Sequence, residues 1–251
     1  MAEAVQVRRY LHRHPELSWE ERNSQAYLRS WLEERGLHAR ETADTGLYVD
    51  IGEGSAPVIY RADLDALPIE DAKQPGRAVC VSEVPGVSHA CGHDVHSSVA
   101  AGLCVVLNRL GSDLPGRVRV VFQPAEEVLP SGGNAVLSEG ILRGARAAIA
   151  LHCDPTRDVG SVGLRVGPLT STSDAFHIEV LGSAGHAARP HLARDAIAGA
   201  AQIVQALYNI VPQRVNPVEP AVLNVGFIEG GDAENVIADR VRLGGNLRTL
   251  N

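Results

Sequence analysis

The sequence predicts an α/β protein: a mainly parallel sheet with helices on both faces, followed by a second, smaller unit. Two observations lead to this prediction. Strand and helix patterns alternate through residues 56–151, which is typical of a parallel sheet with crossover helices. Later the order becomes β-α-β-β, which is the beginning of a β-α-β-β-α-β two-layer sandwich. We therefore expect two domains, at residues 1–163 and residues 164–251.

The first domain is expected to begin with an amphipathic helix. Its apolar residues at helical spacing are Tyr27, Leu28, Trp31 and Leu32. Ser18 and Glu21 predict a capping box before it, and Gly36 predicts its end. The alternation that follows is a strand at 56–60, a helix at 93–110, a strand at 117–122, a helix at 134–142 and a strand at 147–151. The helix at 93–110 should have one apolar face, made of Val95, Val99, Leu103, Val106, Leu107 and Leu110.

The second domain begins with an alternating strand at residues 175–180, followed by a strongly apolar helix at 193–211. Strands at 221–228 and 236–247 come next, joined by a glycine-rich turn. Another helix and strand would complete the sandwich, but the chain stops at Asn251. We therefore expect both domains to be incomplete at the C-terminus.

Composition excludes several classes of function. The chain has 251 residues, is 45% hydrophobic and carries a net charge of −7 without a basic run, so nucleic acid is not an expected partner. No apolar stretch is long enough to span a bilayer, and the N-terminus lacks the apolar core of a signal peptide. Four cysteines in a chain of this size do not form a disulfide framework, which predicts a reducing cytoplasm.

Acidic and imidazole side chains follow each strand of the predicted sheet. Asp63 and Asp65 follow the first strand, Glu126 and Glu127 follow the second, and His152 follows the third. Ligand sites in open parallel sheets form outside the carboxyl ends of the strands. The sequence therefore predicts one site along this edge.

The densest cluster lies in a glycine-interrupted loop that leads into the helix at 93–110. Its members are His89, Cys91, His93, Asp94 and His96. Any one of these histidines alone is more simply a hydrogen-bonded loop residue. A thiol and several imidazoles within eight residues favour zinc or another borderline transition metal. A structural zinc finger does not fit, because no second Cys or His pair occurs nearby at short spacing.

The Glu126-Glu127 pair has two interpretations. Paired acids are often a solvated surface, but this pair follows a buried strand at the position of a site. Adjacent carboxylates can divide the work, with one binding metal and the other accepting a proton from water.

Five motifs together resemble the M20 amidohydrolases, the group that includes hippurate hydrolase and the auxin-conjugate hydrolases. They are LHRHPELS at residues 11–18, RADLDALP at 61–68, HACGHD at 89–94, FQPAEE at 122–127 and GHAARPH at 185–191. The resemblance runs from about residue 5 to the end of the chain. It implies that the second domain is a lid and dimerisation domain. Members of this group finish the catalytic domain with a further segment that carries one more metal-ligating histidine.

The resemblance also implies roles for individual residues. Two divalent ions (zinc, manganese, cobalt or nickel) would bind to Cys91, His93, Glu127 and His152. Glu126 would be the general base, and Asp65 would support the metal ligands from behind. The lid-domain His186 would stabilise the oxyanion in the site of a neighbouring subunit, so a homodimer is expected. Asn235 and Arg248 would contact the substrate, with the Arg248 fork suited to a carboxylate.

The activity that follows is hydrolysis of the amide bond of N-acyl amino acids or related small amides. Two alternatives remain open. The chain is an inactive, truncated remnant of such an enzyme, or it is a dipeptidase or aminopeptidase of the same superfamily. The cysteine-bearing loop favours the branch that acts on acyl amino acids.

Overall fold

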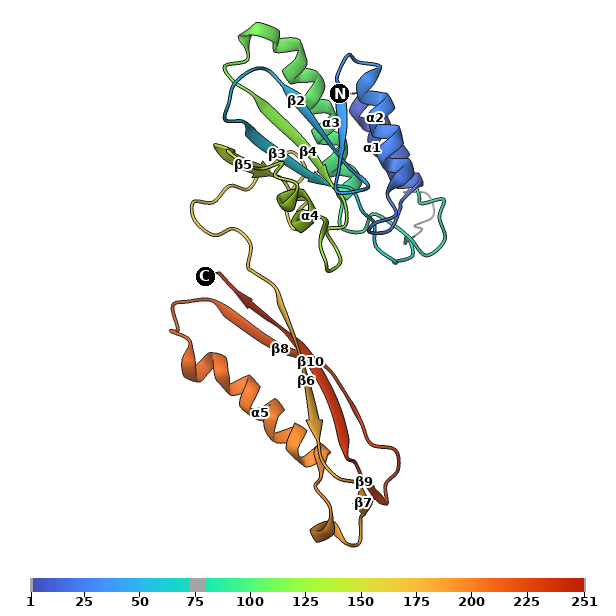
Figure 1. The fold of residues 1–251 in the computed structure, drawn as a ribbon, viewed down its shortest axis with the longest axis vertical. Coiled ribbons are helices and arrows are strands. Elements are labelled where there is room, and N and C mark those ends of the chain that lie inside the picture. The colour runs from blue at the N-terminus through green and yellow to red at the C-terminus, as the bar shows by residue number, and fades with distance from the viewer. Residues whose placement is uncertain (1, 73–79, 251) are drawn as a thin grey trace. The chain divides into compact units, whose positions relative to one another are not determined.

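A computed structural model describes residues 2–72 and 80–250 of the chain. It divides into two compact units, Met1–Asp158 and Val159–Asn251, which we describe separately (Figure 1). No helix among the described residues is both long enough and apolar enough to cross a membrane.

The first unit is built on a five-stranded mixed sheet. Its strands are β1 (Ala39–Thr42), β2 (Gly46–Ile51), β3 (Val58–Asp63), β4 (Val118–Gln123) and β5 (Ala147–Ala150), in the spatial order β1-β2-β4-β3-β5. The pairs β3–β4 and β3–β5 are parallel, whereas β1–β2 and β2–β4 are antiparallel. The prediction of a mainly parallel sheet was therefore wrong for half of the strand pairs. The cause is a tight β1–β2 hairpin, whose turn holds Ala43 and Asp44 at positive φ and so reverses the chain within a few residues.

Helices cover both faces of this sheet (Figure 1). Their bounds are α1 (Ala2–Arg13), α2 (Arg22–Glu33), α3 (His93–Leu110) and α4 (Gly132–Ser138), with a short 3-10 turn at Gly111–Asp113. On one face α1, α2 and α3 pack over the main core, which includes Leu28, Leu32 and Phe122. On the other face α4 packs with Ile59 and Val121 in a smaller core.

Two local predictions for these helices were wrong. Helix α2 has no capping box, because Ser18 donates its hydroxyl to Asp65 and Glu21 is fully buried, where it accepts a hydrogen bond from Thr45. Helix α3 has the predicted bounds but buries a different face. Val99, Val106 and Leu110 are exposed, while the buried side is made of small residues, Ser97, Ala100, Ala101 and Cys104. Small side chains there let α3 approach the sheet and α1 closely.

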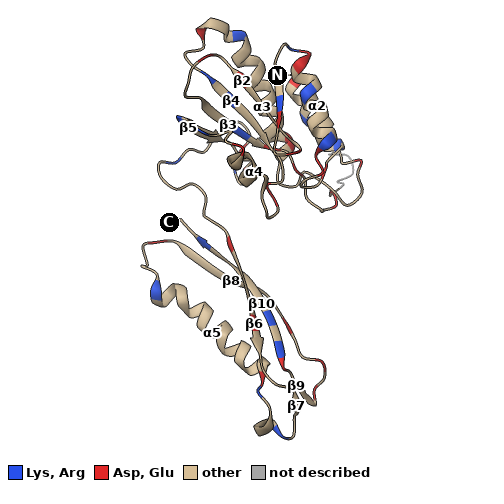
Figure 2. Cartoon of the chain, in the orientation of Figure 1, with Lys and Arg blue, Asp and Glu red and all other residues tan. Residues whose placement is uncertain are grey.

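The second unit contains the predicted β-α-β-β series. Its elements are β6 (Asp174–Leu181), β7 (Gly185–His186), a 3-10 turn at Pro190–Leu192, α5 (Ala196–Arg214), β8 (Ala221–Gly230), β9 (Val236–Ile237) and β10 (Arg240–Thr249). β10 lies between β6 and β8 and is antiparallel to both, and β7 pairs with β9 in a short ribbon. Helix α5 carries no charged residue before Arg214 and packs on one face of the sheet, against Val241 and Leu243 (Figure 2).

Candidate metal centre

The strand ends and the start of α3 meet at one edge of the first sheet. β3, β4 and β5 are parallel, so their carboxyl ends point the same way. Asp63 ends β3 and Asp65 lies just after it, Glu126 and Glu127 follow β4, and His152 follows β5. These groups therefore lie at the carboxyl ends of the parallel strands, where ligand sites of open parallel sheets form.

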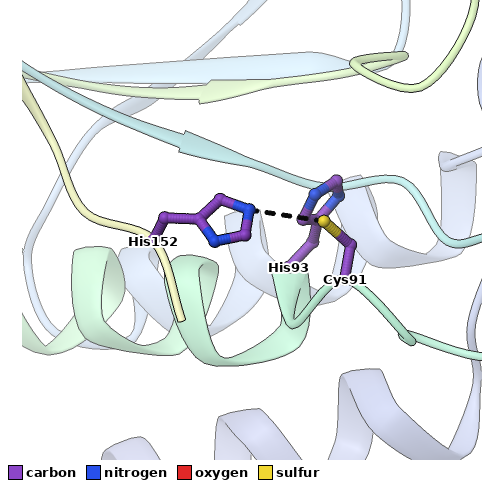
Figure 3. Close-up of side chains that lie close together, drawn as sticks. All are labelled: Cys91, His93 and His152. Atoms are coloured by element: carbon purple, nitrogen blue, oxygen red, sulfur yellow. Dashed lines mark hydrogen bonds between the residues drawn. The ribbon is translucent and has the colours of Figure 1, made fainter. Parts of the chain in front are cut away.

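Cys91, His93 and His152 point toward one another across this edge (Figure 3). The Cys91 Sγ atom lies 3.3 Å from Nε2 of His152. Each of the three offers one ligand atom, and these atoms all lie within 4.8 Å of one another. A second group, His93, Glu126 and Glu127, meets the same criterion and shares His93 with the first.

The His93 ring is held in one orientation by the chain behind it. Its Nδ1 lies 2.7 Å from the backbone oxygen of Asp65, so this nitrogen carries the proton and donates it. The opposite nitrogen, Nε2, is buried and has no hydrogen-bond partner in the part of the chain that the structure describes. It lies 3.7 Å from Oε1 of Glu127, which is likewise buried and unpartnered among the described residues. Two buried acceptors facing each other need a cation or a donor between them.

The Asp65 side chain ties three segments of the site together. Its carboxylate accepts hydrogen bonds from Ser18 Oγ at 2.8 Å and from the backbone N–H of Glu127 at 3.0 Å. Burial opposes ionisation, but these bonds and the neighbouring His93 hold the pKa of Asp65 well below its usual range. Asp65 is therefore an anion that orients both His93 and the Glu127 loop.

Negative charge accumulates on the open side of the site. Burial raises the pKa of the Cys91 thiol to about 12, and the adjacent carboxylates of Glu127 and Glu126 add to the rise. Burial and the charge of Glu127 likewise raise the pKa of Glu126. A thiol surrounded by carboxylates becomes a thiolate when a nearby cation offsets their charge.

The residues present fit a divalent transition metal. Thiolate, imidazole and carboxylate are the ligands that zinc and similar borderline ions take. Ligands of a tetrahedral zinc ion lie about 3.4–3.6 Å apart, given metal–ligand bonds of about 2.0–2.3 Å. The Cys91–His152 and His93–Glu127 separations, 3.3 Å and 3.7 Å, are close to that spacing.

Comparison with known proteins agrees with this arrangement. The model of the peptidase family M20/M25/M40 matches residues 59–238. This chain belongs to that family. It is 44% identical over 249 residues to the N-acetyl-L-cysteine deacetylase of Bacillus subtilis, covering 98% of this chain and 59% of that protein.

Two further relatives resemble this M20 chain over nearly its full length. The N-acyl-L-amino acid amidohydrolase of Geobacillus stearothermophilus is 36% identical over 251 residues, which are 99% of this chain and 67% of that protein. The crystal structure of the Bacillus subtilis YXEP protein, described as a dinuclear metal binding peptidase from the M20 family, superimposes with a TM-score of 0.82 at 34% identity, covering 100% of this chain and 64% of that one. The chain thus spans about three fifths of the length of the first curated relatives it matches.

The remaining predicted site residues of this M20 chain lie in its second unit. His186 is exposed at the end of β7, and its Nδ1 accepts a hydrogen bond from the N–H of Ala188. Asn235 lies beside it, since its backbone oxygen accepts from Ala187. Arg248 is exposed near the far end of β10, eight residues beyond Arg240, which is about 26 Å along a strand. The unit therefore brings His186 and Asn235 together and separates both from Arg248.

Sequence reasoning named Asp63, Asp94 and His96 as candidate site residues but gave them no separate role, whereas in this M20 chain they form a buried layer beneath the site. There His96 contacts Asp63, with 2.6 Å between His96 Nδ1 and Asp63 Oδ1. On the other side of the loop, Asp94 is 2.8 Å from Arg8 and 2.9 Å from His12. The signal for the first contact was the i, i+3 spacing of His93 and His96, which places both imidazoles on one side of α3. The second joins α1 to α3, and only the folded chain brings them together.

Proposed function

We propose that this chain carries the metal centre of a hydrolase that cleaves the amide bond of N-acyl amino acids or related small amides. The observation that carries the proposal is the convergence of Cys91, His93, Glu127 and His152 around buried, unpartnered ligand atoms, with Glu126 beside them. The substrate class is supported by relatives named as an N-acetyl-L-cysteine deacetylase and an N-acyl-L-amino acid amidohydrolase.

We assign the metal ligands to two overlapping groups. Cys91, His93 and His152 form the first group, and His93 and Glu127 belong to the second. Two groups that share a ligand support two neighbouring divalent ions of zinc, manganese, cobalt or nickel. When bound, such ions make water nucleophilic near neutral pH and polarise the amide carbonyl. Asp65 keeps the ligands in place by accepting from the backbone of Glu127 and lying behind His93. A reducing compartment such as the cytoplasm suits this site, because a ligating thiol must stay reduced.

Glu126 is the proposed proton carrier. Its side chain is 39% exposed, so it faces the open side where substrate and water enter. Its carboxylate accepts a proton from the water that attacks the carbonyl carbon. It then gives that proton to the amine nitrogen as the C–N bond breaks. A pKa raised by burial and by Glu127 brings this group closer to the working pH of a general base.

The second unit would act on substrate as a lid, with residues supplied by two copies of the chain. Arg248 suits the free carboxylate of an N-acyl amino acid through its two-pronged fork. The strand length from Arg240, five residues after Asn235, to Arg248 is about 26 Å, and a substrate of that size does not span it. This separation supports a homodimer in which His186 and Asn235 serve the partner's site, where His186 steadies the oxyanion. β6 has a strand partner on one side only among the described residues, which leaves an edge for such pairing.

The test combines metal analysis with hydrolysis. The purified chain is loaded in turn with zinc, manganese, cobalt and nickel, its metal content is measured, and it is given a panel of N-acetyl amino acids. We expect bound metal and release of acetate with at least one ion. Cys91→Ser should lose both, whereas Cys80→Ser, which changes a half-buried cysteine outside the site, should lose neither. Absence of metal and of hydrolysis in the unmodified chain would contradict the proposal.

A further inference from the structure

His96 is buried directly beneath the metal centre and both of its ring nitrogens are engaged. Its side chain is 1% exposed. Nδ1 lies 2.6 Å from Oδ1 of Asp63, and Nε2 accepts a hydrogen bond from the backbone N–H of Cys153 at 2.9 Å. Asp63, His93 and His96 are close enough together to suggest a further metal site. However, no lone pair of His96 is left for a metal, since the backbone N–H can only donate.

These contacts fix the tautomer of His96 and connect it to the sheet. Because Nε2 accepts, the ring is neutral and its proton lies on Nδ1, from which it is donated to Asp63. Asp63 in turn accepts from Arg61 at 2.7 Å, and Arg61 also donates to Gln123 Oε1 at 3.0 Å. A continuous chain of hydrogen bonds thus runs from β4 through β3 and α3 to the segment after β5.

That segment carries His152, and the backbone of Cys153 makes two hydrogen bonds, one through the peptide group on each side of its Cα atom. Its N–H is held by His96, while its carbonyl oxygen lies 2.7 Å from Nδ1 of His152. A carbonyl can only accept, so His152 carries its proton on Nδ1, and the lone pair of Nε2 faces Cys91 Sγ at 3.3 Å. The position of the Cys153 backbone, fixed through its N–H, therefore decides where its carbonyl lies and so where the ligand nitrogen of His152 points.

Packing alone holds this segment weakly. All four residues of β5 are exposed, as are Leu151 and His152, so they have few apolar contacts of their own. The bond from Cys153 to a histidine that is itself buried and doubly hydrogen-bonded is the rigid attachment nearest to His152.

We propose that His96 is a positioning residue that sets the ligand geometry of His152 by holding the Cys153 peptide, an inference that rests on the proposed metal centre. His96 acts through His152 and does not itself bind metal. Loss of such an outer partner typically weakens metal affinity by about 10–100-fold.

The test is a Co²⁺ titration of the full chain and of His96→Ala, His152→Ala and the double variant. Cobalt reports its ligands, because a thiolate ligand gives a charge-transfer band and the ligand number sets the intensity of the visible bands. We expect His96→Ala to keep the thiolate band and to bind Co²⁺ about 10–100-fold more weakly. The double variant should bind no more weakly than His152→Ala, since both changes remove the same ligand.

Three conservative variants separate positioning from general loss of structure. His96→Gln keeps a donor for Asp63 and an acceptor that reaches the Cys153 N–H, so it should restore most of the affinity. His96→Asn is long enough to hydrogen-bond to Asp63 but too short to reach the Cys153 N–H, so it should behave like His96→Ala. It replaces His96→Ala in the test if the alanine variant does not fold. Ser98→Ala removes a buried hydroxyl on the same helix that donates to Val95, and should leave affinity unchanged.

Each outcome decides between the two claims. Unchanged Co²⁺ affinity in His96→Asn, or losses that add in the double variant, would overturn the role of His96 and leave the metal centre standing. Absence of a thiolate band in the unmodified chain, or no effect of His152→Ala, would overturn the metal centre itself, and the positioning role with it.

Discussion

Glu126 and Glu127 are neighbours in the chain with different surroundings. Glu127 places a buried oxygen, without a partner among the described residues, opposite His93, and its backbone N–H is held by Asp65. Glu126 is more exposed and no hydrogen bond to its carboxylate is seen among the described residues. The residue before them, Ala125, has φ +46°, a sharp turn that directs the two side chains differently. These different surroundings support the proposed roles, with Glu127 binding a cation and Glu126 moving a proton.

Changing Glu126 to Gln should separate these roles. The amide keeps the shape of the side chain but cannot carry a proton, so we expect hydrolysis to fall by about 10²–10⁴-fold. Metal content should stay equal to that of the unmodified chain. Glu127→Gln is the matched comparison and should lose metal. If Glu126→Gln loses metal while Glu127→Gln keeps metal and loses only hydrolysis, the two roles are the reverse of those assigned here.

Glu21 should make stability depend on pH in a specific direction. It is fully buried, and although Thr45 and the N–H of Ala125 donate to it, burial raises its pKa above the ordinary value of 4.5. The folded chain thus holds this proton more firmly than the unfolded chain. Its contribution to the free energy of unfolding is complete below pH 4.5 and is lost as pH rises through the folded-state pKa.

Glu21→Gln cannot ionise and is the reference for this effect. We expect the unmodified chain to gain stability relative to Glu21→Gln when pH is lowered from about 7 to about 4. Urea unfolding of the two proteins at each pH, with chelator present throughout, measures the difference. A difference that stays constant, or that grows toward neutral pH, would contradict a raised pKa at this position.

At the scale of elements, the sequence predicted those parts whose signals are local. The α3 bounds followed from a long apolar period between Gly92 and Gly111, and the strand-end rule located the groups that form the site. The prediction of the buried face of α3 was wrong. Hydrophobicity favours Val and Leu for a buried position, whereas close packing of this helix selects the smaller residues Ala, Ser and Cys. The β1–β2 hairpin was missed, and so was α1, whose charged sequence masks its two fully buried residues, Val7 and Leu11. The role of His96 depends on backbone contacts between distant segments, which no spacing encodes.

The start of α4 is packed tightly against the loop that carries the two glutamates. A Cβ atom on Gly132 would lie 2.0 Å from the carbonyl oxygen of Pro124, and the Gly132 N–H donates to Ala125. Gly132→Ala should therefore push this loop away and lower the free energy of unfolding by about 1–3 kcal/mol. Metal affinity should fall as well, because Glu127 lies in the displaced segment.

Gly116→Ala provides the matched control. A Cβ atom there meets nothing within 4 Å in the part of the chain that the structure describes, so the change should leave stability equal or slightly higher. Urea unfolding and Co²⁺ titration of both variants make the comparison. Equal effects of the two substitutions on unfolding and on metal binding would show that the contact with Pro124 does not position the site.

At the scale of the whole molecule, the proposed metal ligands and the proposed substrate contacts fall in different compact units. Every proposed ligand lies in Met1–Asp158, while His186, Asn235 and Arg248 lie in Val159–Asn251. Each unit has a hydrophobic core of its own. Units with separate cores need not unfold together, and a ligand stabilises the unit that binds it.

Arg248→Ala should therefore affect substrate and not metal. We expect KM for N-acyl amino acids to rise, because the carboxylate loses a bidentate partner, while the cobalt spectrum stays unchanged. Arg248→Lys keeps the charge without the fork and should recover only part of the loss. An altered cobalt spectrum in Arg248→Ala would mean that this side chain contributes to the metal centre.

Unfolding with and without metal tests the separation of the two units directly. Both tryptophans of the chain, Trp19 and Trp31, lie in the first unit, so fluorescence reports that unit alone, whereas far-UV circular dichroism also follows α5 and its sheet. A metal present at about 100 times its dissociation constant adds about 2.7 kcal/mol to the stability of the unit that binds it. For a unit of this size that raises the fluorescence midpoint by about 5–10 °C, and chelator should reverse the shift. Cys91→Ser should abolish this shift.

The circular dichroism change that remains after the transition seen by fluorescence reports the second unit. Its midpoint should be the same with and without metal. A metal-induced shift of equal size in both signals would show instead that the two units unfold as one.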